Sequence, residues 1–161
     1  MIKVAIIEDN EFMRDGWKTI LDFDPDIVVT NTYQSCEDAF SAKDFGNNDL
    51  ILLDIELPGM HGTEGVKVIR EQYPHLLVLM VTIHDENEKI FKALRNGAVG
   101  YLLKKVSPKE LTEAVKNAVD GGSPMSPNIA RKVITSFQNK EDDAVTLSEK
   151  ETEVLSALSD G

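Results

Sequence analysis

Five short apolar runs of strand character occur between residues 4 and 103, and segments with the periodicity of a helix separate them. The runs are Val4–Ile7, Ile27–Thr30, Leu50–Leu53, Leu76–Val81 and Gly100–Leu103. Strands that alternate with helices are typical of parallel sheets, because each helical crossover carries the chain back to the end where the strand began. The alternation therefore predicts an α/β fold, a doubly wound five-stranded parallel sheet with helices on both faces.

Helix-capping residues mark the starts of several predicted helices. Asn10 is a candidate N-cap before the first helix, and Ser107 with Glu110 forms the clearest capping box in the chain. Asp85 with Glu88 resembles another capping box. These signals predict helices directly after residues 10, 85 and 107.

Apolar residues between the first two runs predict how that helix packs. We expect Phe12, Met13 and Trp17 to lie in the core, and Cys36 to be a small buried residue without a redox task. A second helix is expected over residues 37–43, although few local signals support it.

The sequence changes character after residue 121, which divides the chain into three parts. Residues 1–121 form the predicted α/β domain. Residues 122–145, rich in Ser and Pro and then acidic, are expected to form a linker with a short helix. Residues 146–161 are predicted to begin a new helix, with Ser148 and Glu151 as its capping box.

Composition excludes several classes of partner. The net charge of -11 argues against a surface for duplex DNA or for an anionic membrane on this chain, because phosphate attraction needs clustered Lys and Arg. The first acid follows the N-terminus too soon for a signal peptide, and no apolar run reaches the length of a membrane span. A single cysteine excludes an internal disulfide, which fits a protein of the reducing cytoplasm.

Polar residues follow four of the predicted strands. Glu8 and Asp9 follow the first run, Asp54 the third, Thr82 the fourth and Lys104 the fifth. In a doubly wound sheet of order 2-1-3-4-5 these strand ends lie side by side. Three converging carboxylates repel one another unless a cation joins them, and an all-oxygen ligand set suits Mg²⁺. With a lysine and a hydroxyl beside it, Asp54 would act as a nucleophile toward a phosphoryl group.

These residues, with the sequence around them, resemble the receiver domain of bacterial two-component response regulators. The resemblance covers roughly the first three quarters of the chain. The motifs that carry it are Glu8–Asp9, the stretch from Asp54 to Gly62, Thr82, and the stretch from Gly97 to Lys104. It implies that Asp54 accepts a phosphoryl group from a histidine kinase by self-catalysed transfer, and is slowly dephosphorylated without acting as an enzyme. It further implies Mg²⁺ bound by Glu8, Asp9, Asp54 and the backbone carbonyl of Glu56.

The resemblance also implies roles for residues around the phosphoacceptor. Thr82 and Tyr101 would form the switch pair that links phosphorylation to homodimer formation. Glu56 and His84 occupy positions that tune how water reaches the acyl phosphate. Ile83 stands where the family usually has a small residue, so we expect it to border the phosphorylation site and to slow exchange there.

The tail from Leu147 to Leu155 is similar to the opening helix of the LuxR-type helix-turn-helix domain in the NarL/FixJ branch. This similarity implies a transcription factor whose recognition helix would follow residue 161. We therefore expect a fragment of a protein longer by about one small domain. DNA contact is expected only through that missing part.

Three other functions fit parts of the pattern. A haloacid dehalogenase-type phosphatase also uses an Asp after a strand with Mg²⁺, but it needs a second Asp two residues on, where this chain has Glu56. A flavodoxin-like nucleotide binder needs a first loop rich in Ser, Thr and Gly, whereas Glu8 and Asp9 would repel phosphate. A receiver-like interaction module that is never phosphorylated would not need the intact set of acids, Thr82 and Lys104.

Overall fold

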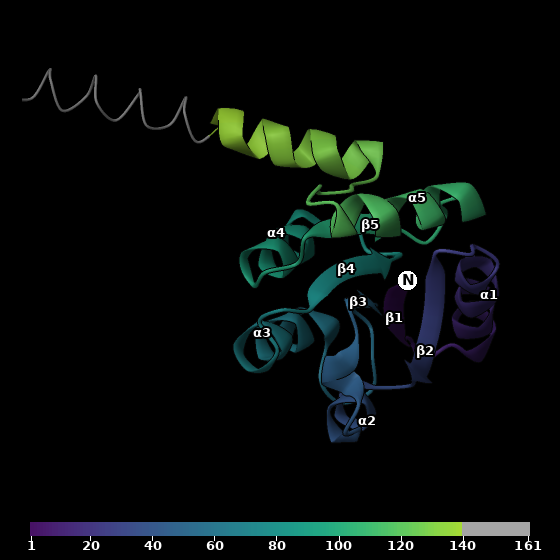
Figure 1. Cartoon of the computed structure of the whole chain (residues 1–161). Coiled ribbons are helices and arrows are strands. Elements are labelled where there is room, and N and C mark those ends of the chain that lie inside the picture. The colour runs from purple at the N-terminus through teal and green to yellow at the C-terminus, as the bar shows by residue number, and fades with distance from the viewer. Residues whose placement is uncertain (140–161) are drawn as a thin grey trace, which may run out of the picture. The chain divides into compact units, whose positions relative to one another are not determined.

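The computed structural model describes residues 1–139 and contains one five-stranded parallel sheet of order β2-β1-β3-β4-β5 (Figure 1). This confirms the predicted fold and strand order. The strands are β1 (Ile2–Ile7), β2 (Ile27–Tyr33), β3 (Leu50–Leu53), β4 (Leu77–Thr82) and β5 (Gly100–Leu103). The helices up to residue 120 are α1 (Glu11–Asp22), α2 (Cys36–Ser41), α3 (Gly62–Gln72), α4 (Asn87–Arg95) and α5 (Pro108–Val119), with a short 3₁₀ helix, η1, at Phe45–Asn47.

Helices cover both faces of the sheet, α1 and α5 on one side and α2, α3 and α4 on the other (Figure 1). Because both faces are covered, the strands read as continuous apolar runs rather than as alternating ones. All four residues of β3, Leu50–Leu53, are fully buried. The central strand that leads to Asp54 is therefore held from both sides.

The chain forms two compact units, residues 1–129 and residues 130–161. The first unit contains the sheet and its helices and ends with the buried Ile129. Of the second unit, residues 130–139 are described, and they are helical. The predicted domain boundaries remain predictions, and the predicted helix after residue 146 lies outside the described residues.

Local capping signals placed two helix starts correctly. The Asn10 side chain accepts a hydrogen bond from the Met13 amide (3.0 Å), and the Ser107 hydroxyl accepts one from the Glu110 amide (3.2 Å). Each bond satisfies an amide that has no partner within its helix. Cys36 is fully buried, as expected.

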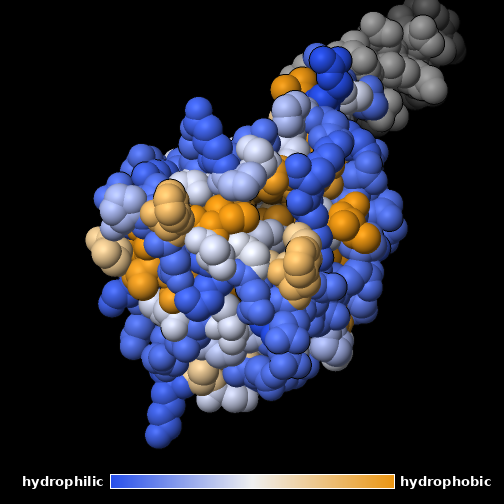
Figure 2. All heavy atoms as spheres, turned by 90° about the vertical axis from the view of Figure 1, so that its right-hand side faces the viewer, coloured by the Kyte–Doolittle hydropathy of each residue, from blue (hydrophilic) through white to orange (hydrophobic). Residues whose placement is uncertain are grey.

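Other local predictions were wrong. The helix expected from Asp85 begins at Asn87, with Glu86 as an N-cap whose side chain makes no capping bond. The second helix, expected over residues 37–43, is present as α2, and only its bounds differ, since it spans Cys36–Ser41. Phe12 is 84% exposed, because it lies one residue before Met13 and so about 100° around the helix from the face that packs on the sheet. Figure 2 shows apolar side chains exposed on the side of the molecule that carries α1.

A segment after α5 pairs with the free edge of β5. The Tyr101 amide donates to the Pro124 carbonyl (2.9 Å), and the Ser126 amide donates to the Tyr101 carbonyl (3.1 Å). The Ser126 hydroxyl accepts from the Leu103 amide (3.0 Å). Residues 124–126 thus continue the sheet beyond its last strand and satisfy the backbone groups of an otherwise open edge.

An acidic site at the carboxyl edge of the sheet

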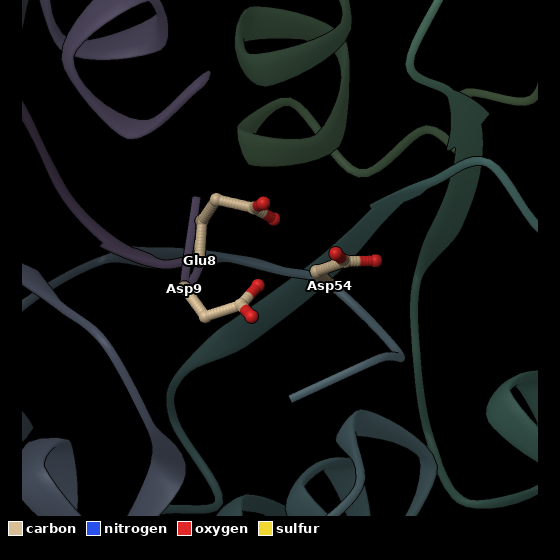
Figure 3. Close-up of side chains that lie close together, drawn as sticks. All are labelled: Glu8, Asp9 and Asp54. Carbon is tan, nitrogen blue, oxygen red and sulfur yellow. The ribbon is translucent and has the colours of Figure 1, made fainter. Parts of the chain in front are cut away.

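Glu8, Asp9 and Asp54 converge at the ends of β1 and β3 (Figure 3). Their carboxylates offer oxygens that all lie within 4.8 Å of one another. Glu8 and Asp54 are buried, whereas Asp9 is exposed. The parallel register places Ile7 opposite Leu53, so the acids follow paired residues on adjacent strands. The sheet thereby brings the adjacent Glu8 and Asp9 together with Asp54, which is distant in sequence.

Lys104, which follows β5, supplies the positive charge of this cluster. Its Nζ lies 2.9 Å from Asp54 Oδ2 and 3.0 Å from Glu8 Oε1. Burial disfavours the charge on Lys104, but the hydrogen bonds to Asp54 and Glu8 outweigh burial and raise the pKa of the ammonium group. The ammonium also lies 5.7 Å from the centre of the Trp17 ring, within cation–π range. Lys104 therefore stays charged beside Asp54.

One ammonium does not balance the cluster. Burial and the nearby Asp54 carboxylate raise the pKa of Glu8 from 4.5 to about 7, against the opposing effect of Lys104. Glu8 Oε2 is buried and has no hydrogen-bond partner among the described residues. A buried carboxylate oxygen without a partner is costly. These residues therefore fit a hard divalent cation such as Mg²⁺, whose preferred ligands are carboxylate oxygens.

The backbone around Asp54 is tightly constrained. The Ile55 amide donates to Asp54 Oδ1 (2.7 Å), and the Gly62 amide donates to the Ile55 carbonyl (2.8 Å). A Cβ at Gly62 would overlap the carbonyl oxygen of Asp54. Glycine at the first residue of α3 thus allows the helix to begin directly against the backbone of Asp54.

The response regulator receiver domain family matches residues 4–116. The chain belongs to this family. It is therefore a response regulator of a phosphorelay, and its fold and strand order are those of a receiver.

Two relatives that match nearly the whole chain are named as transcriptional regulatory proteins. The chain is 31% identical to the transcriptional regulatory protein DegU of Brevibacillus brevis, over 99% of this chain and 75% of DegU. It is 30% identical to the transcriptional regulatory protein LnrK of Bacillus subtilis, over 100% of this chain and 78% of LnrK.

Solved structures of LuxR-family response regulators have the same fold. One from Aurantimonas sp. has a TM-score of 0.78 and 26% identity, over 84% of this chain and 96% of that chain. A DNA-binding response regulator from Staphylococcus aureus has a TM-score of 0.69 and 28% identity, over 75% of this chain and 100% of that one.

In this receiver, the expected switch residues Thr82 and Tyr101 meet at His84. Both are fully buried. The Thr82 hydroxyl accepts a hydrogen bond from the His84 amide (3.3 Å), and the Tyr101 hydroxyl donates one to the His84 carbonyl. Burial, followed by the charges of Glu86, Asp54 and Asp85, raises the pKa of the Tyr101 phenol. The Tyr101 side chain thus connects β5 to the loop after β4.

The rim of the receiver's acidic site combines Glu56 and His84 with residues that sequence reasoning missed. His84 Nε2 lies 3.3 Å from Glu56 Oε1, and His84 Nδ1 lies 3.5 Å from Glu86 Oε2. Lys89 Nζ lies 3.4 Å from Glu56 Oε1. Glu56, Glu86 and Lys89 line a hollow of about 320 Å³ between the β3–α3 loop and α4. Lys89 and Glu86 have no distinctive motif around them, so only their position in the fold reveals them.

Ile83 is 70% exposed, between the buried Thr82 and the rim residue His84. Its predicted effect on exchange at the site remains a prediction. Each helix among residues 1–139 is too short or too polar to span a membrane.

Proposed function

We propose that Asp54 is the phosphoacceptor for a cognate histidine kinase, and that its phosphorylation controls DNA binding and transcription by the protein. The observation that carries this proposal is the pairing of the buried Asp54 with Lys104, next to a cluster of acids that fits Mg²⁺. Membership of the receiver family supports it further.

In the proposed reaction an Asp54 carboxylate oxygen attacks the phosphorus of a phosphohistidine. The O–P bond forms while the P–N bond breaks, and the electron pair of that bond stays on the imidazole nitrogen. The Lys104 ammonium, 2.9 Å from Asp54 Oδ2, is placed to stabilise negative charge on the transferred group, and the Thr82 hydroxyl supplies a donor. No step requires a second acid two residues on, as a haloacid dehalogenase-type phosphatase would.

Mg²⁺ would be held by Glu8, Asp9, Asp54 and the backbone carbonyl of Glu56. When bound, it offsets the negative charge of the carboxylates and of the phosphoryl oxygens. Glu8 must be ionised to act as a ligand, and its raised pKa near 7 makes the metal-free site a proton acceptor.

Phosphorylation would be transmitted through Thr82 and Tyr101. A phosphoryl group on Asp54 would attract the Thr82 hydroxyl at the end of β4. The Tyr101 hydroxyl bonds to the His84 carbonyl and so holds the loop after β4 against β5. We propose that this arrangement favours a homodimer, and that a LuxR-type domain then binds DNA. Glu56, His84 and Ile83 would set the lifetime of the acyl phosphate and keep dephosphorylation slow.

The direct test is Asp54→Asn, assayed with a radiolabelled small phosphodonor in the presence of Mg²⁺. We expect labelling to be lost, because an amide oxygen is a far poorer nucleophile than a carboxylate. Asp49→Asn is the matched control, because Asp49 precedes the opposite end of β3 and contacts the Lys3 amide. Labelling that persisted in Asp54→Asn would refute the proposal, and steady release of phosphate over many turnovers would favour a phosphatase instead.

A further inference from the structure

The loop between β3 and α3 is fastened to α2 by one side chain. Glu37, in the first turn of α2, accepts a hydrogen bond at Oε1 from the Met60 amide (2.9 Å). The two residues are separated by 23 positions in the sequence. Glu37 is exposed, so a role in the hydrophobic core does not explain this contact.

The loop is shaped to receive the Glu37 carboxylate. Gly59 has a φ of 75°, in the left-handed region that favours glycine. A Cβ at Gly59 would overlap Glu37 Oε2 and lie 3.0 Å from Glu37 Cδ. Only glycine therefore allows the carboxylate to lie against this backbone and to reach the next amide.

A neighbouring contact holds α3 against the same end of α2. A Cβ at Gly65 would lie 2.7 Å from Cys36 Sγ, and one at Gly62 would overlap the Asp54 carbonyl oxygen. The start of α2 thus contacts both the loop and α3. Between Asp54 and Gly62 the backbone is held at the strand end, by the bond from the Gly62 amide to the Ile55 carbonyl, and by the bond from the Met60 amide to Glu37.

We propose that Glu37 is a positioning residue for the metal site. By holding Met60, it fixes the backbone path on which the Glu56 carbonyl, the expected metal ligand, is located. Glu37 acts through the loop and does not itself contact the metal or the phosphoryl group. This inference rests on the proposed function, because it assumes that Glu56 is a ligand.

The experiment compares Glu37→Ala, Glu37→Gln and Asp38→Ala in the whole chain. Glu37→Ala removes the acceptor, and Glu37→Gln keeps an acceptor oxygen without the charge. Asp38→Ala removes the same charge from the next residue of α2, whose amide, not its carboxylate, is bonded to Ser35. Hydrogen exchange of the Met60 amide and the Kd for Mg²⁺ are measured by NMR and calorimetry.

We expect Glu37→Ala to speed exchange of the Met60 amide and to raise the Kd for Mg²⁺ roughly 3- to 10-fold, because one hydrogen bond is lost. Glu37→Gln should restore both properties to within about twofold, and Asp38→Ala should leave both unchanged. Labelling of Asp54 in Glu37→Ala should recover at saturating Mg²⁺, because only the affinity is affected. The melting temperature of the metal-free protein verifies that each variant is folded.

Three results would overturn the inference. They are a Kd in Glu37→Ala equal to that of Asp38→Ala, an effect in Glu37→Gln as large as in Glu37→Ala, and faster Met60 exchange with an unchanged Kd. Failure of the proposed function is a different result. The parent would then neither bind Mg²⁺ nor become labelled, while exchange of the Met60 amide would still respond to Glu37→Ala.

Discussion

Without a bound cation, the carboxylates of the acidic site repel one another. Lys104 is shared between Glu8 and Asp54, and Glu8 keeps one buried oxygen without a partner among the described residues. The metal-free protein relieves this conflict by taking up a proton on Glu8, as its raised pKa indicates. The residues that suit the site to a metal therefore destabilise the metal-free fold.

This conflict predicts a pH dependence of stability for the metal-free protein. Glu8 has a pKa of about 7 in the folded state against 4.5 as the reference value, so the folded state binds the extra proton between these values. The free energy of unfolding should decrease as pH rises from about 4.5 to about 7 and change little from this group above that range. Urea denaturation in a chelator across this range measures the effect.

Glu8→Gln is the control for that measurement, because it keeps the shape of the side chain and cannot titrate. Relative to the parent, the free energy of unfolding of Glu8→Gln should increase as pH rises to about 7. Parallel curves for the two proteins would show that Glu8 is not the titrating group.

Among the secondary-structure elements, β5 joins the switch residue to the segment after α5. Both backbone polar groups of Tyr101 bond to this segment, the amide to Pro124 and the carbonyl to Ser126. Gly100 allows the close approach, because a Cβ there would overlap the Pro124 carbonyl oxygen and lie 2.8 Å from Leu79 Cδ1. The last strand is therefore fixed on one side by β4 and on the other by residues 124–126.

Gly100→Ala should release this segment from β5. We expect a loss of roughly 1–3 kcal/mol in the free energy of unfolding, from overpacking and from displaced hydrogen bonds. Gly16→Ala is the matched control, because Gly16 lies in α1 and a Cβ there would meet no atom within 4 Å. That change should stabilise the protein by about 0.5–1 kcal/mol. Equal shifts of the melting temperature in the two variants would contradict the prediction.

At the scale of the whole molecule, we expect phosphorylation of Asp54 to act on a distant surface through Thr82 and Tyr101. The described route runs from Thr82 through the backbone of His84 to the Tyr101 hydroxyl. The backbone of Tyr101 also bonds to residues 124 and 126. A shift of Tyr101 would therefore displace this segment near the end of the first compact unit. We propose that this route links the site to residues 124–126.

Tyr101→Phe tests this route by removing only the hydroxyl. With Mg²⁺ and the phosphate mimic beryllofluoride, sedimentation velocity should show a dimer weaker than that of the parent by roughly 3- to 10-fold in Kd. Tyr33→Phe is the control, because the Tyr33 hydroxyl is buried and has no partner among the described residues. Equal dimerisation of Tyr101→Phe and the parent would exclude the Tyr101 hydroxyl from signal transmission.

Much of the fold was predictable because its signals are local. The apolar runs that became β3 and β5 were placed at their observed bounds, and the caps at Asn10 and Ser107 depend on bonds spanning only three residues. The candidate site was predictable for a related reason. Parallel strands bring their carboxyl ends to one edge, so acids placed after separate strands converge whatever the loops do.

Only the tertiary structure decided the features that join residues distant in sequence. The contact of Glu37 with Met60, the pairing of Met125 with Tyr101, and the burial of Glu8 depend on how elements pack after they form. The same reason explains the failure at Asp85. A capping box needs a particular backbone path, and here the preceding His84 is held by Thr82 and Tyr101, so α4 begins only at Asn87. Local chemistry thus determined which residues could form the site, whereas packing determined their burial, their partners and their pKa values.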